Sequence, residues 1–449
     1  MDGERRDGRR RDGRRGERRG GGVVTHVIVE PSPALPLVSV VVAFRSGSAH
    51  DPVGREGLGR ITARMLRRGA EGWSSEKIEQ TIDLLGGELG VDVSPSASTV
   101  HFEVIRRSLD PFVDLASTLL ARPSFDEAEL ARLKREAEAE LIESRDSDGT
   151  LCARAFRRTL FAGHPYGRRV AGCIPALRAI ERADVVSFYG AHYARENAIV
   201  TISGDVDVEE GHAIAERLLS GLPVGASVPD PVQPPPRRPG RRLVFVDKPE
   251  RTQTQMIVGG LGTHPNDPDH VALLVANTAF GGTFTSRLMQ EVRAKRGWSY
   301  GASSRVGFDR QRDAFTMWTA PKASDASACL ALKLELLHTL RKDGITKDEL
   351  SFVKKYLVRS HAFEVDTARK RAYQKLEAAL YDLPEGYHDK QLEQIEGVTL
   401  DEANAAIRER LSEDDLVVSV VGTFSQIGDA VAKSVPRLLE TQVDPFDLE

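Results

Sequence analysis

Hydrophobic positions along the chain follow the period of a strand in some segments and that of a helix in others. Leu37–Phe44 is rich in valine and predicts a buried strand. Leu58–Leu66 carries apolar residues at helical spacing and predicts an amphipathic helix. Two long charged segments, Asp126–Glu143 and Thr346–Glu364, predict further helices. Strands and helices are therefore mixed along the chain, which indicates an α+β fold.

The order of these patterns repeats in the second half of the chain. A charged helical segment starts at Phe125, and a similar one starts at Ile345, 220 residues later. A short buried strand pattern starts at Asn197, and its counterpart starts at Asp415, 218 residues later. Two separate segments with nearly one offset predict a duplicated unit, so we expect two homologous domains, each a mixed sheet packed with helices.

Composition divides the chain into four parts. Residues 1–22 hold nine Arg and five acidic residues with almost no apolar side chain, and they predict a disordered tail. A nucleic-acid-binding arm is the alternative, but the interleaved acids and the absence of aromatic residues favour a solvated tail. Residues 23–222 form the expected first domain, 223–242 a proline-rich linker, and 243–449 the second domain.

The overall composition is that of an ordinary globular protein. The chain has 449 residues, 40% of them hydrophobic and 29% charged, and its net charge of −4 indicates neither a nucleic-acid nor a membrane partner. Its three cysteines form no CxxC motif and predict free thiols. No apolar run approaches the roughly 20 residues that span a bilayer. We therefore expect a cytoplasmic protein.

The histidines give no sign of a metal site. No two of the eleven stand three or four positions apart, so no helix can present a histidine pair to zinc. HExxH and HxxEH motifs are both absent.

The turn and helix at Arg45–Gly69 nevertheless resemble the zinc-binding segment of the insulinase/pitrilysin peptidases, a family that includes the mitochondrial processing peptidases. The matching residues are Gly47, Ser48, Gly54, Gly57, Leu58, Met65, Leu66 and Gly69. The first His, the Glu and the second His of the family motif fall on Arg60, Ala63 and Arg64. A guanidinium has no lone pair for zinc, and alanine cannot take a proton.

The resemblance also places the third zinc ligand of the family on Glu140, within the first charged helix. One carboxylate without imidazoles cannot hold zinc tightly. We expect Glu140 to pair with Arg60 or Arg64, because such a pair would neutralise the former ligand; a solvated surface carboxylate is the alternative. We therefore expect this chain to bind no cofactor.

A second family motif lies at Phe280–Ser304. Its matching residues are Gly281, Gly282, Ser286, Arg287, Leu288, Val292, Arg293, Gly297 and Tyr300. In the family, the residues at Arg293 and Tyr300 face a substrate held on a zinc-bearing half. A guanidinium and a phenol can hydrogen-bond peptide carbonyls and stabilise an oxyanion.

The resemblance therefore implies a non-catalytic subunit of a heteromeric zinc peptidase. Its two domains would form half of a clam-shell chamber, with an HxxEH-bearing homologue as the partner and unfolded peptides as substrates. Zinc would sit in that partner. Two alternatives stay open: a structural scaffold without peptidase role, and an autonomous peptidase with a different site.

Overall fold

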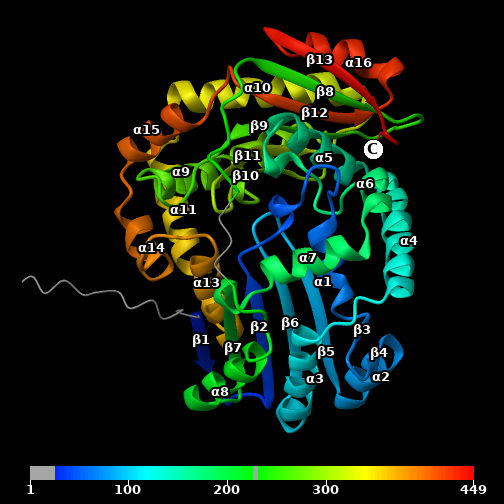
Figure 1. Cartoon of the computed structure of the whole chain (residues 1–449). Helices are drawn as coiled ribbons and strands as arrows, with labels where there is room; N and C mark the ends of the chain where they lie inside the picture. The colour runs from blue at the N-terminus through cyan, green and yellow to red at the C-terminus, as the bar shows by residue number, and fades with distance from the viewer. Residues whose placement is uncertain (1–25, 226–230, 449) are drawn as a thin grey trace, which may run out of the picture.

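The first half of the chain is built on one open five-stranded sheet (Figure 1). The computed structural model describes residues 26–225 and 231–448. The strands are β1 (His26–Pro31), β2 (Leu37–Phe44), β5 (Gly87–Val93), β6 (Ser98–Ile105) and β7 (Ala198–Gly204). Their order is β1-β7-β2-β6-β5, with β1 and β7 parallel and the other pairs antiparallel. Strand β5 therefore forms an edge of this sheet.

The second half repeats this sheet and adds one strand. Its strands are β8 (Arg241–Asp247), β9 (Gln255–Leu261), β10 (Ala302–Phe308), β11 (Arg312–Thr319), β12 (Val417–Gly422) and β13 (Leu438–Pro445). Their order is β10-β11-β9-β12-β8-β13, so each of the first five corresponds to a strand of the first sheet. The expected α+β fold with two homologous domains is confirmed.

Within the described residues, eight α-helices belong to the first half of the chain; several of them pack on its sheet, and another packs on the sheet of the second half. They are α1 (Leu58–Met65), α2 (Ser75–Leu85), α3 (Leu109–Ala121), α4 (Glu127–Glu143), α5 (Asp148–Leu160), α6 (Ile174–Ala179), α7 (Arg182–His192) and α8 (Val208–Leu219). A two-stranded hairpin of β3 (Gly69–Ala70) and β4 (Trp73–Ser74) lies between α1 and α2. Side chains start several of these helices: the Asp126 carboxylate accepts the amides of Ala128 and Glu129 at the start of α4.

The helices of the second half are α9 (His270–Asn277), α10 (Ala326–Asp343), α11 (Lys347–Ser360), α12 (Ala362–Val365), α13 (Ala368–Leu380), α14 (Tyr387–Gly397), α15 (Leu400–Arg410) and α16 (Phe424–Lys433). The helix predicted for Thr346–Glu364 divides into α11 and α12. Between α9 and β10 lies a π-helical turn, Met289–Ala294, and the amide of Lys295 just after it donates to the Gln290 carbonyl five residues back.

One helix of each half packs on the sheet of the other half. Helix α5 lies against β12, β9 and β8, and helix α13 lies against β7 and β1 (Figure 1). The two helices start 220 residues apart, at Asp148 and Ala368, which is the offset of the repeat. Ion pairs join each helix to the opposite half, among them Lys248–Asp148 at 2.7 Å and Arg369–Glu103 at 2.6 Å. The two units therefore interlock by exchanging equivalent helices.

Buried apolar residues follow the same arrangement. One core lies between the first sheet and its helices, and another lies between the second sheet and its helices. Two smaller clusters lie under the exchanged helices: Phe156 of α5 packs near Val244 and Val417, and Leu376 of α13 packs near Ile199. Burial of this surface stabilises the contact between the halves.

The ends of the predicted domains differ slightly from the observed elements. Strand β8 begins at Arg241, inside the segment 223–242 that we predicted as a linker. The predicted tail 1–22 lies outside the described residues. In the described ranges, no helix is both long enough and apolar enough to cross a membrane.

Candidate functional site

Helix α1 starts at a turn that only particular residues can form. Gly57 has a φ of 98°, and a Cβ there would meet the Leu177 side chain at 3.0 Å. The buried Asp51 carboxylate accepts the amides of Gly57 and Gly59, each at 2.7 Å. Burial raises the pKa of Asp51 to about 7, although these two amides act to lower it. The glycines and Asp51 thus fix where α1 begins and which way its side chains point.

The three residues that the resemblance assigns to the family's ligand positions contact one another across α1 and α4. Arg60 Nη2 donates to Glu140 Oε2 at 2.8 Å, and Arg64 Nη1 donates to the same oxygen at 3.1 Å. Arg64 Nη2 also lies 2.8 Å from Glu140 Oε1. The predicted ion pair is present, and it involves both arginines rather than one. Ala63 is 1% exposed and brings no polar group to the site.

This triad lowers the pKa of the Glu140 carboxyl. Partial burial acts to raise the pKa, but the hydrogen bonds from Arg60 and Arg64 outweigh it. Glu140 is therefore ionised at neutral pH and balances part of the positive charge on α1.

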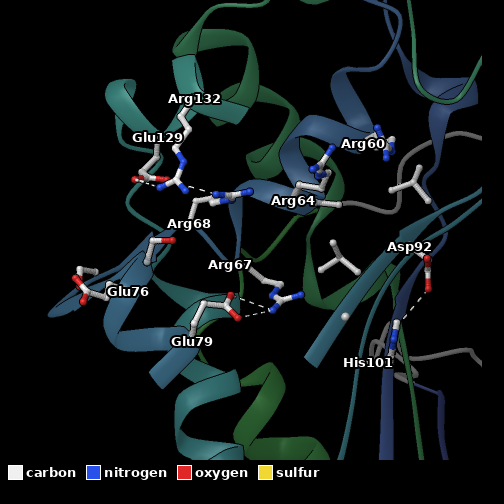
Figure 2. A pocket seen from close by; sticks show the side chains of 16 residues that line it. Arg60, Arg64, Arg67, Arg68, Glu76, Glu79, Asp92, His101, Glu129 and Arg132 are labelled. Carbon is white, nitrogen blue, oxygen red and sulfur yellow. Dashed lines mark hydrogen bonds and ion pairs between the residues drawn. The ribbon is translucent and has the colours of Figure 1, made fainter. Parts of the chain in front are cut away.

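Further ion pairs lie beside this triad, and Figure 2 shows those of Arg67 with Glu79 and of Arg68 and Arg132 with Glu129. Beyond Arg64, the next arginines are Arg67, which pairs with Glu79 at 2.9 Å, and Arg68, which pairs with Glu136. Arg132 of α4 also reaches Glu136, at 3.2 Å. These additional residues were not predicted from the sequence, although arginines at positions 60, 64 and 68 recur at helical spacing.

A cavity of about 1190 Å³ lies between this network and the edge strand β5. Five arginines line it, together with Glu79, Glu129 and the β5 residues 90–93 (Figure 2). Each of the five arginines has a carboxylate within 4.0 Å. The wall of the cavity is therefore charged but largely neutralised.

These side chains do not fit a zinc ion. Zinc in proteins takes imidazole, thiolate or carboxylate ligands, and Arg60 and Arg64 offer none of these. Both are cations at any physiological pH and would repel a divalent metal. In the described part of the chain, no group of three or more His, Cys, Asp or Glu residues could hold a metal ion.

Arg293 and Tyr300 lie together in the second half. Arg293 is on the π-helical turn, and its guanidinium carbon lies 4.7 Å from the centroid of the Tyr300 ring. The Phe284 ring flanks the same guanidinium at 4.8 Å. Both rings are largely exposed, Tyr300 by 84% and Phe284 by 68%. Cation–π contacts of this kind hold a guanidinium in place without using its N–H groups.

The guanidinium of Arg293 makes no hydrogen bond or ion pair with any residue that the structure describes, and its Nη1 is shielded from solvent. Its neighbours along the chain differ. Arg287 binds Glu349 through two nitrogens, at 2.5 and 2.6 Å, and Arg296 binds Glu291 at 2.7 Å. The N–H donors of the Arg293 side chain therefore have no acceptor within the described chain.

The predicted site residues thus lie in two separate groups. Arg60, Arg64 and Glu140 contact one another, and Arg293 contacts Tyr300, but within the described ranges no hydrogen bond or ion pair joins the two groups. Phe284, which lies just after Gly281 and Gly282 in the second motif, was not predicted as a site residue. An aromatic residue in a loop beside two glycines was the only signal.

Two family models match the chain. The model of insulinase, peptidase family M16, matches residues 26–173. The model described as the peptidase M16 inactive domain matches residues 179–357.

Some similar proteins are described as non-peptidase homologs and others as zinc proteases. A non-peptidase homolog, YmxG of Helicobacter pylori, is 22% identical over 397 residues, which cover 88% of this chain and 91% of that protein. An uncharacterized zinc protease of Mycobacterium leprae is 27% identical, and the match covers 93% of each chain.

Solved structures share the whole fold. A peptidase M16 inactive domain from Pseudomonas fluorescens has a TM-score of 0.82 and 25% identity, covering 88% of this chain and 95% of that one. A chain of complex III2 from Candida albicans has a TM-score of 0.73 at 14% identity, covering 92% of this chain and all of that one.

Proposed function

Because the chain belongs to the insulinase family, peptidase family M16, and is of its inactive type, we propose that it is the non-catalytic subunit of a heteromeric zinc peptidase. It binds a peptide and completes the active site of a homologous partner that carries HxxEH. One observation carries this proposal: arginines stand at the positions that the resemblance assigns to the two histidine ligands and pair with Glu140, whereas Arg293 lies against Tyr300 without a described acceptor.

The first group explains why a partner is needed. Zinc supplies the activated water in this family, and Arg60 and Arg64 replace the imidazoles that would bind it. Their pairing with Glu140 stabilises the same contact between α1 and α4 without a metal. The chain therefore keeps the shape of a peptidase half and depends on another subunit for the reaction.

The second group explains what the chain contributes. The Arg293 guanidinium and the Tyr300 hydroxyl can donate hydrogen bonds to peptide carbonyls and to the oxyanion that forms during hydrolysis. Such donors act best when they are held in advance, and the flanking rings hold Arg293. The wide exposure of Tyr300 suits a residue that reaches toward another molecule.

The edge of the first sheet gives a peptide further room. Strand β5 pairs only with β6 among the described strands, so its other edge has backbone groups available for an extended chain. The cavity of about 1190 Å³ lies beside residues 90–93 of this strand. An extended peptide can add to such an edge by backbone hydrogen bonds.

Reconstitution with a partner tests the proposal. A homologue of similar length that carries HxxEH, sought first beside the gene for this chain, is purified alone and mixed with this chain at equal concentration. Turnover of an unfolded fluorogenic peptide by the partner is expected to rise on mixing, and Tyr300→Phe is expected to reduce the rise. A complex that forms without any change in turnover would instead support the scaffold alternative.

A control addresses the third alternative. The isolated chain is incubated with the same peptide, with and without a chelator, and its zinc content is determined. We expect no chelator-sensitive turnover and no bound zinc. Turnover by the isolated chain would mean that it is an autonomous peptidase.

A further inference from the structure

The outer face of helix α5 lines a second cavity, which is separate from the arginine-lined cavity beside β5. This α5 cavity has a volume of about 440 Å³ and lies between the helix and the segment 166–173 that follows it. The helix contributes residues that recur at helical spacing on one face: Thr150, Ala153, Arg154, Arg157 and Arg158. The opposite face, which includes Leu151 and Phe156, is buried on the second sheet. Packing of α5 on that sheet therefore leaves its arginine-bearing face toward the α5 cavity.

Positive charge dominates the lining of the α5 cavity. Arg168 and Arg169 of the following segment join the three arginines of α5, and Glu56 is the one acidic residue among the described residues that line it. The Glu56 carboxylate accepts the Gly54 amide at 3.1 Å. The cavity beside β5 also has five arginines, but four acidic residues line it as well. The two cavities therefore differ in the charge of their linings although they hold the same number of arginines.

The arginines of this lining differ in what holds them. Arg157 Nη1 donates to both oxygens of the Asp313 carboxylate, at 2.8 and 3.0 Å, so this arginine also joins α5 to the second half. Arg168 Nη1 instead donates to the backbone carbonyl of Asp51 at 2.9 Å, which is a neutral acceptor. Within the described chain Arg168 forms no ion pair, so its positive charge remains toward a ligand.

The wall between these charges is apolar. Ala153, Val170 and Pro95 have no polar side-chain group. The arginine stems add methylene groups, because this side chain is apolar up to its guanidinium. The hydroxyl of Tyr166 accepts the Gln311 amide at 3.2 Å and is therefore already hydrogen-bonded. A ligand that matches this lining has an anionic group for the guanidiniums and an apolar part for the rest of the wall.

The size of the α5 cavity suits a small molecule. Pockets that enclose small ligands commonly measure about 300–1,000 Å³, and this cavity lies in that range. Guanidiniums bind both phosphates and carboxylates through paired N–H groups.

We infer that the α5 cavity binds a small amphipathic anion, a phosphate or carboxylate group on an apolar body. Arg154 and Arg168 bind the anionic group, and Ala153 and Val170 contact the apolar body. This inference is independent of the proposed function, because none of these residues belongs to the two groups that support it.

Four simple compounds test the inference on the full-length chain by titration calorimetry. Octyl phosphate and octanoate carry both parts of the expected ligand and are used below the concentration at which they form micelles. Methyl phosphate carries the anionic group alone, and octanol carries the apolar part alone. We expect one of the two amphipathic anions to bind about tenfold or more tightly than methyl phosphate and octanol, because only it uses both parts of the lining. The comparison of octyl phosphate with octanoate tells which anionic group the site prefers.

Cys173 reports where the ligand binds. This residue lines the α5 cavity and is partly exposed, whereas Cys152 and Cys329 are buried. Iodoacetamide should therefore label Cys173 first, and mass spectrometry follows the labelled peptide. At about ten times its dissociation constant, the tighter of the two anions should slow this labelling about tenfold, since the thiol reacts only in the unoccupied fraction. The fast labelling should disappear in Cys173→Ser.

Variants assign binding to the lining. Arg154→Gln and Arg168→Gln should each weaken binding of the amphipathic anion about tenfold, the scale of a charge-assisted hydrogen bond. Ala153→Phe should weaken it as well, because the ring fills the apolar part of the cavity. Arg178→Gln is the matched control: Arg178 of α6 pairs with Glu138 at 2.9 Å outside the lining, so binding should not change. Thermal unfolding confirms that each variant folds.

The inference is overturned if none of the four compounds binds, or if methyl phosphate or octanol binds as tightly as both amphipathic anions. Binding that leaves the labelling of Cys173 unchanged, or that Arg178→Gln weakens as much as Arg168→Gln, would overturn it too. None of these results bears on the proposed subunit role, which is judged by turnover in the reconstituted complex.

Discussion

Two clusters of arginine in this molecule differ in whether their donors are satisfied. On α1, Arg60 and Arg64 share the Glu140 carboxylate and continue into a network of further ion pairs. In the second half, Arg293 lies against two exposed rings and has no acceptor within the described chain. The same type of side chain thus joins two helices in one place and lacks a described acceptor in the other.

Under the proposed function, this difference explains how a peptidase-like subunit would lose catalysis and still bind substrate. Replacing metal ligands with arginine would leave a repulsive pocket unless carboxylates balanced the charge, and Glu140 does so. No such balance was built around Arg293, which is the arrangement expected where a substrate supplies the acceptor.

Restoring the metal ligands should convert the satisfied cluster into a zinc site. The triple variant Arg60→His, Ala63→Glu, Arg64→His places two imidazoles beside Glu140, which α4 already holds against α1. We expect one zinc per chain with a dissociation constant in the micromolar range or tighter, measured by titration calorimetry.

Adding Glu140→Gln to that variant is the control and should weaken zinc binding about tenfold or more, because a neutral amide is a poor zinc ligand. A triple variant that folds and binds no zinc would mean that positions 60 and 64 are not where the metal sits in this fold.

Loss of the Glu140 carboxylate should destabilise the fold, whereas loss of the Arg293 guanidinium should not. Glu140→Gln leaves Arg60 without an anionic partner, and we expect the free energy of unfolding to fall by about 1 kcal/mol at most, since these side chains are partly exposed. Arg293→Met removes no hydrogen bond and should change stability by less than about 0.5 kcal/mol. Urea unfolding measures both; a larger loss in Arg293→Met would reveal a structural role for that residue.

The stabilisation that the Glu140 ion pairs provide should also depend on pH. The pKa of Glu140 is lowered in the folded chain below its ordinary value of 4.5, so its ionised form stabilises the fold. That contribution is fully present above pH 4.5 and is lost as the pH falls through the lowered pKa. The stability difference between the wild type and Glu140→Gln should therefore shrink below pH 4.5 in urea titrations. A difference that stays constant down to pH 3 would contradict the assigned pairing.

Much of the fold could be predicted because short sequence patterns indicate its strands, its helices and its repeat. The valine-rich run of β2, the helical spacing in α1 and the repeat offset near 220 all lie in short stretches of sequence. The exchange of α5 and α13 could not be predicted. Leu151 and Phe156 show that α5 has an apolar face, but nothing local says that this face belongs to the sheet of the other half.

Some residues of the candidate site could likewise be predicted from the sequence, and others could not. The family resemblance singled out Arg60, Arg64, Arg293 and Tyr300 because they stand at fixed distances from the glycines of the two motifs. It singled out Glu140 by its offset from Arg64. Phe284 and the outer ion pairs depend on which side chains meet in space. An exposed aromatic residue has no period and no partner in the sequence, so only the structure identifies its contact with Arg293.

The most direct test compares the two clusters in one assay, the kcat/KM of the reconstituted complex for an unfolded peptide. Arg293→Ala is expected to lower kcat/KM about 100-fold, the scale of a lost oxyanion donor. Arg60→Ala should change kcat/KM by no more than about twofold, because that guanidinium is already bound to Glu140. Full activity in the Arg293→Ala complex, or a large loss in the Arg60→Ala complex, would contradict the account.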